Sequence, residues 1–108
     1  MMLQNKEKKM ELKEKIMQVL EIVENGKTGI STVDKYHAIP IILLKIKIEE
    51  KIGFAEMKVA INQLKDEKRV LFLKNDDVAR DSAIMTYGVD KDAVTEDMLF
   101  AFSYLKKV

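Results

Sequence analysis

The chain contains no cysteine, and it has one histidine, one proline and four glycines. Without cysteine there is no disulfide scaffold, no thiolate metal site and no cysteine nucleophile. A single histidine, His37, excludes a catalytic histidine pair and a metal site built from several histidines. The longest apolar run, 38–44, is far shorter than the roughly 20 residues of a membrane span. The charged N-terminal segment has no apolar signal core, so we expect a cytoplasmic protein.

What the chain does contain suits one globular domain. Its 108 residues are 47% hydrophobic and 34% charged, which is enough for an independent core and too apolar for a disordered chain. We therefore expect a single domain over 1–108. The net charge of +1 means that any contact with nucleic acid depends on a local patch.

Hydrophobic spacing predicts the elements of secondary structure. The run 39–53 fits a helix, because Pro40 stands near its start and Gly53 just past its end, although the alternation over 45–48 also fits a strand. Residues Met57, Ala60, Ile61 and Leu64 form a clear helical stripe. In chain order we expect a helix over 5–24, a short capped turn over 31–37, helices over 39–53 and 54–68, strands over 69–74 and 83–87, and a helix over 95–107.

This order resembles the winged helix-turn-helix family over about residues 8–90. The similarity is carried by IPIILLKIKIEEKIGFAEMKVAINQLKDEKRVLFLKND, which looks like the second helix, the turn, the recognition helix and the first wing strand. The resemblance implies an α+β, mainly α, fold with a two-stranded β-wing, to which the helix over 95–107 is added. It also implies double-stranded DNA as the partner, and a small dimeric transcriptional regulator as the function.

One face of the expected recognition helix is basic. At about 100° per residue, Lys58, Asn62, Lys65 and Arg69 fall within about 60° of one another, apart from the apolar stripe and the acidic residues. Lysine and arginine can contact guanine edges or phosphates, and asparagine can pair with adenine. Ser31 and Thr32, with Lys35, are further candidates for a phosphate contact, although simple capping also explains the two hydroxyls.

The expected wing loop is acidic. Asp76, Asp77 and Asp81 surround Arg80, so only Arg80 and Lys74 are expected to reach DNA there. This acidity, with the near-neutral net charge, keeps two alternatives open. One is a winged-helix module that binds protein, and the other is a replication or partition accessory of a mobile element.

No enzyme, cofactor or metal site is expected. Gly26-Lys27-Thr28 resembles the end of a phosphate-binding loop, but Glu21 stands where that loop needs its first glycine. The helix over 95–107 is apolar nearly all round, which predicts burial on two sides and a homodimer. The candidate interface residues are Phe100, Tyr104, Met98 and Leu105.

Overall fold

The computed structural model describes residues 11–48 and 51–108. The described part is α+β and mainly helical, with one three-stranded sheet. Its helices are α1 (Leu12–Glu24), α2 (Ser31–Tyr36), α3 (Ile41–Ile48), α4 (Phe54–Asp66), α5 (Asp76–Tyr87), the short 3-10 helix η2 (Lys91–Ala93) and α6 (Glu96–Ala101). Its strands are β1 (Ile39–Pro40), β2 (Val70–Leu73) and β3 (Tyr104–Lys107). Residues 5–10 of the helix expected over 5–24, and residues 49–50 of the helix expected over 39–53, lie outside the described residues. The helix expected over 39–53 is wrong at its ends, because residues 39–40 form β1 and residues 51–53 are not helical.

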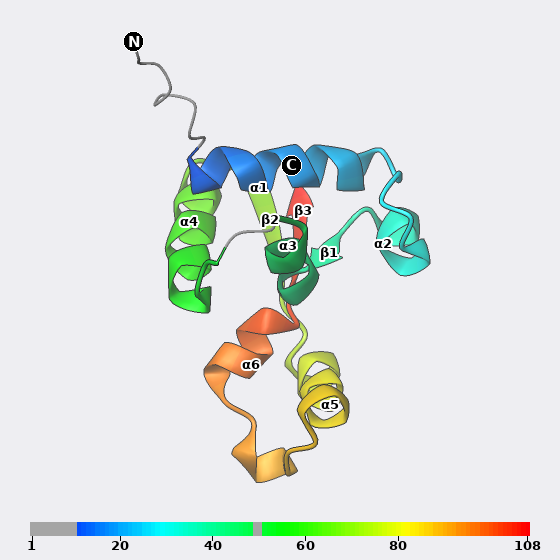
Figure 1. The fold of residues 1–108 in the computed structure, drawn as a ribbon, viewed down its shortest axis with the longest axis vertical. Helices are drawn as coiled ribbons and strands as arrows, with labels where there is room; N and C mark the ends of the chain where they lie inside the picture. Colours follow the sequence, from blue (N-terminus) through cyan, green and yellow to red (C-terminus); the bar gives the residue numbers. More distant parts are fainter. Residues whose placement is uncertain (1–10, 49–50) are drawn as a thin grey trace.

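Helix α1 lies across one end of the fold, and the other elements lie on one side of it (Figure 1). The helix predicted over 5–24 is confirmed in its described part, where Ile16, Leu20 and Val23 are fully buried at helical spacing. The helix ends at Asn25-Gly26, where Gly26 has a φ of +67°, the left-handed conformation that glycine adopts without strain.

Helices α3 and α4 are confirmed as helices. α3 begins directly after Pro40 and buries Ile41 and Leu44. α4 buries the four residues of the predicted stripe, Met57, Ala60, Ile61 and Leu64. The two helices, with α1, enclose most of the core, and they leave the opposite side of α4 at the edge of the molecule (Figure 1).

The sheet is antiparallel, with the strand order β1-β3-β2. Leu105 of the central strand is paired with Ile39 on one side and with Phe72 on the other, and it is fully buried. The strand predicted over 69–74 is therefore confirmed as β2, but its antiparallel partner is β3.

The predicted second wing strand, 83–87, is wrong, because these residues lie in α5. Asn75 caps this helix by accepting a hydrogen bond from the Val78 amide at 3.2 Å, and Gly88 ends it at a φ of +67°. Ala79 and Ala83, four residues apart, are the buried face. The Asn-Asp-Asp sequence is a helix start here, with both aspartates in the favourable first turn.

The predicted helix over 95–107 is wrong in its second half. Thr95 caps α6 as its position suggests, with its hydroxyl accepting from the Met98 amide at 3.2 Å. The helix ends at Ala101, and 104–107 pairs with β2 over four registered positions. Residues 74–103 therefore form a helical insertion between the two strands, where a short wing loop was expected.

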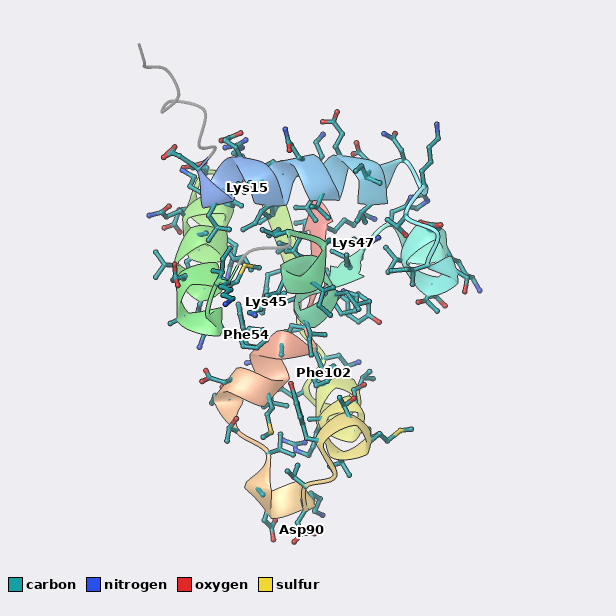
Figure 2. All side chains as sticks on the ribbon, viewed as in Figure 1. Lys15, Lys45, Lys47, Phe54, Asp90 and Phe102 are labelled. Atoms are coloured by element: carbon teal, nitrogen blue, oxygen red, sulfur yellow. The ribbon has the colours of Figure 1, made fainter. Side chains whose placement is uncertain are left out.

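Aromatic rings join the insertion to the rest of the fold. The Phe100 ring of α6 lies 6.0 Å from that of Phe72, stacked on it, and 6.4 Å from that of Phe54, edge to face. Within the insertion, Tyr87 of α5 and Phe102 lie edge to face at 6.0 Å. Figure 2 shows Phe54 beside α6 and Phe102 between α5 and α6.

Candidate nucleic-acid interface

Three lysines and an asparagine line one groove between α4, β2 and α6. Lys58, Asn62 and Lys65 recur at intervals of four and three residues on one side of α4, and Lys74 directly follows β2. The groove has a volume of about 190 Å³, and α6 closes its other wall with Glu96, Leu99 and Phe100. We call Lys58, Asn62, Lys65 and Lys74 the lysine groove. The structure thus brings together three residues of the predicted basic face and one of the predicted wing residues.

The lysines at this surface lie over phenylalanine rings. The Lys58 ammonium is 5.2 Å from the centroid of Phe100, and that of Lys65 is 4.9 Å from the centroid of Phe72. Beside the groove, Lys45 of α3 stands in the same relation to Phe54 at 5.5 Å (Figure 2). Such cation–π contacts position an ammonium group while leaving its charge accessible at the surface.

Carboxylates of the insertion neutralise part of the groove. Lys58 pairs with Asp97 of α6 at 3.4 Å, and Lys74 pairs with Asp76 of α5 at 3.7 Å. Across residues 11–48 and 51–108, Lys65 has no carboxylate partner and the Asn62 side chain has no hydrogen bond. Lys65 and Asn62 are therefore the groove residues most available to a ligand.

Arg69, the fourth predicted residue of the basic face, lies elsewhere. Its guanidinium donates to Glu14 of α1 at 3.2 and 3.4 Å and to Glu67 at 3.2 Å. Hydrogen bonds to Glu14 and then Glu67 raise the pKa of Arg69 above its ordinary value. A hydrogen bond from Lys13 is the main cause that lowers the pKa of Glu67. Arg69 thus belongs to an ion-pair network that ties the end of α4 to α1.

The predicted phosphate contact at Ser31, Thr32 and Lys35 is separate from the groove. Figure 1 shows α2 and α4 at opposite ends of α1. Ser31 and Thr32 are exposed, and the helix cap is Ile30, which makes no side-chain hydrogen bond. The predicted capping by either hydroxyl is therefore wrong, and the Lys35 ammonium lies 5.3 Å from the Tyr36 ring.

Asp34 holds the loop before α2 in place. Its carboxylate accepts from the Thr28 hydroxyl at 2.5 Å, the Thr28 amide at 2.8 Å and the Gly29 amide at 3.1 Å. The Thr28 hydroxyl is the largest cause that lowers the pKa of Asp34. The sequence alone did not predict these hydrogen bonds, because they join Asp34 to residues five and six positions earlier in the chain.

The acidic residues predicted for a wing loop lie on α5 instead. Asp77 and Asp81 are exposed on that helix, and Arg80 pairs with Asp77 at 3.6 Å. Arg80 is therefore already engaged within α5.

The four candidate interface residues do not share a helix face. Phe100 is 8% exposed and Leu105 is fully buried, both against residues of their own chain. Tyr104 lies on β3 opposite Leu73, and Met98 is half-buried on α6. The helix stops before Tyr104, so Phe100 and Tyr104 do not form the shared aromatic face that was expected to mediate dimerisation.

The described residues contain neither a metal-binding cluster nor a membrane-spanning helix. No group of three or more histidine, cysteine, aspartate or glutamate side chains in 11–48 and 51–108 is placed to hold a metal ion. In the same residues, every helix is too short or too polar to cross a bilayer.

No protein-family model matches the chain, and no curated protein or solved structure matches it either.

Proposed function

We propose that this chain is a winged-helix protein that binds double-stranded DNA through α4 and the lysine groove. The order of its elements supports the proposal: after α1 and the short α2 come β1, α3, α4 and β2, and β3 follows the helical insertion, in a sheet of order β1-β3-β2. In this interpretation α3 and α4 are the helix-turn-helix pair, α4 is the recognition helix, and residues 74–103 replace the tip of the wing.

The observation that carries the proposal is the placement of Lys58, Asn62, Lys65 and Lys74 in one groove. These residues come from different elements, and their convergence places three lysine ammonium groups on one surface of a nearly neutral protein. Lys58 and Lys74 are paired with carboxylates of the insertion, and Lys65 has no carboxylate partner among the described residues. Duplex phosphates are the polyanion that such a surface suits, and the adjoining helix has the diameter that fits a major groove.

The aromatic residues favour a duplex over a single strand. Proteins that bind single strands offer aromatic faces on which bases stack. Here Phe72 and Phe100 stack on each other, and each carries a lysine ammonium. The ammonium groups therefore stay at the surface, that of Lys65 without a carboxylate partner among the described residues, whereas the rings are engaged with neighbours.

The biological role in this proposal is transcriptional regulation by occupancy of an operator. A homodimer on a two-fold operator and a cytoplasmic location, both expected from the sequence, remain parts of it. The dimer interface would be formed by other residues, because Phe100 and Tyr104 do not share a helix face.

A second candidate function is protein binding through α5. Val78 is 51% exposed and Met85 is 86% exposed on this helix, near the carboxylates of Asp77 and Asp81. Exposed apolar groups rimmed by charge are typical of contact surfaces between proteins. This surface is separate from the lysine groove, so the two functions are compatible.

The test is a charge reversal in the groove. The K58E/K65E variant should bind a random-sequence 20-base-pair duplex far more weakly than the wild type does, measured by fluorescence anisotropy at several salt concentrations. The slope of log K against log salt should become shallower by about one unit for each phosphate that the variant no longer binds. Both side chains are solvent-accessible, so the thermal midpoint should change little.

The matched control is K91E/K106E, which changes the net charge equally at η2 and on β3, outside the groove. Weaker binding by the control alone, or equal affinity of K58E/K65E and the wild type, would show that α4 does not face DNA.

A further inference from the structure

A ridge of uncharged side chains runs along α4 and shares Asn62 with the lysine groove. Ala55, Val59 and Asn62 are exposed, and Val59 is 58% exposed although it is apolar and lies in the middle of the helix. At about 100° per residue, the three lie within about 60° of one another, on the side of α4 opposite its buried stripe. We call these three residues the α4 ridge.

The ridge chemistry matches the major-groove edge of an A·T pair. An asparagine side chain can accept a hydrogen bond from N6 of adenine through its oxygen and donate one to N7 through its N–H, so it pairs bidentately with adenine. Apolar side chains contact the thymine C5-methyl group, which no G·C pair has. Asn62 supplies such an amide, with no hydrogen bond to any described residue, and Val59 and Ala55 supply methyl groups.

The spacing also fits neighbouring base pairs. Val59 and Asn62 are separated by about 4.5 Å along the helix axis, close to the roughly 3.4 Å between successive base pairs. The ammonium groups of Lys58 and Lys65 lie over Phe100 and Phe72, on the groove side of the ridge. They are thus placed for phosphates, which leaves the ridge to contact the bases.

Asp66 limits which part of α4 enters the groove of the DNA. This exposed carboxylate stands four residues after Asn62, at the end of the helix, where it would be repelled by phosphates. Contact with base edges is therefore confined to residues that precede Asp66, and the N-terminal residues of the recognition helix are the ones that read base edges in helix-turn-helix proteins.

We propose that the α4 ridge reads A·T base pairs in the major groove, with Asn62 on adenine and Val59 on a neighbouring thymine methyl group. This proposal rests on the proposed function, since it requires α4 to enter duplex DNA. It adds the class of sequence that the protein prefers.

The experiment compares 20-base-pair duplexes of alternating A·T and alternating G·C sequence with the wild type, N62A, V59S and Q63A. Gln63 is the control for Asn62, because it is an exposed amide about 100° around α4 from Asn62, next to Val59 and outside the lysine groove. The wild type and Q63A should prefer the A·T duplex by about tenfold, and N62A should lose that preference. Binding to the G·C duplex should be the same for all four proteins.

Two modified duplexes establish which groove is read. Uracil in place of thymine removes the C5-methyl group, and 7-deazaadenine removes the N7 acceptor, while Watson–Crick pairing is kept. Uracil should weaken binding of the wild type but not of V59S, and 7-deazaadenine should weaken binding of the wild type but not of N62A.

The outcomes separate this inference from the function on which it rests. Binding of both duplexes with equal affinity, a preference for G·C, or an A·T preference that survives N62A and both modified bases overturns the reading by the ridge and leaves DNA binding in place. Failure of the wild type to bind any duplex overturns both.

Discussion

The ammonium group of Lys58 lies 3.4 Å from a carboxylate oxygen of Asp97, so α4 and the helical insertion are joined by an ion pair at the edge of the lysine groove. Both partners are exposed, with 43% of the Lys58 side chain and 75% of the Asp97 side chain accessible to solvent. A phosphate that binds Lys58 therefore competes with a carboxylate of the same chain.

Removing that competitor should strengthen DNA binding. We expect Asp97→Asn to raise affinity for duplex DNA several-fold at low salt, with the gain shrinking as salt rises. Stability should change little, because an exposed ion pair contributes about 0–1 kcal/mol. The control is Asp90→Asn, the same change at the far tip of the insertion (Figure 2). Equal gains in DNA affinity for both variants would show that the change in net charge, and not the loss of the Lys58–Asp97 ion pair, causes the effect.

Replacing Arg69 should affect folding and leave DNA binding intact. Its ion pairs with Glu14 and Glu67 tie the end of α4 to α1, so Arg69→Ala should lower the thermal midpoint. Affinity for duplex DNA and its salt slope should stay as in the wild type, as titrations at three salt concentrations would show. A shallower slope in Arg69→Ala would mean that this residue contacts phosphate after all.

Phe100 should act as a core residue. Phe100→Ala removes a ring packed between those of Phe54 and Phe72, and should lower the free energy of unfolding by about 3–5 kcal/mol. Tyr104→Ala, at a half-buried site on the other side of the sheet from Leu105, should cost clearly less. Urea denaturation measures both. Dissociation of an oligomer by Phe100→Ala without a change in stability would contradict this assignment.

Asp34 should make stability depend on pH in the acid range. Its pKa in the folded protein is lowered below the ordinary 3.8, chiefly by the Thr28 hydroxyl. The stabilisation is therefore complete above pH 3.8 and is lost as the pH falls through the lower folded-state value. Asp34→Ala should be less stable than the wild type at pH 7, and the gap should close below pH 3.8. Thermal melts from pH 2 to 7 test this, and a gap that stays constant with pH would exclude the carboxylate as its source.

The parts of the fold that follow from local pattern could be predicted. α1 and α4 each carry a strong helical stripe, and Pro40 marks the start of α3. α5 could not be predicted by the same means, because Asn75-Asp76-Asp77 begins either a turn or a helix. The helix is favoured because it buries Ala79 and Ala83. The local sequence does not show which part of the fold packs against these two residues.

The C-terminal strand and part of the site depend on distant residues. The sequence 104–107 extends a helical pattern, but pairing with β2 and with β1, more than 30 residues earlier in the chain, holds it as a strand. Likewise, the spacing of Lys58, Asn62 and Lys65 along one helix could be predicted directly. Arg69 does not lie on that face, because its guanidinium donates to Glu14, 55 residues away in the chain.

The central strand of the sheet is the last of the three to be synthesised. β1 and β2 have no partner in the described sheet other than β3, so neither can form its hydrogen bonds until residues 104–107 have left the ribosome. The helices α1, α3 and α4 all end before residue 67, so they can dock on one another before β3 has been synthesised. Closing the sheet is then a late event in folding, and it draws the insertion against α4 through Phe100. The groove on the proposed DNA-binding face is thus completed only when the last strand is in place.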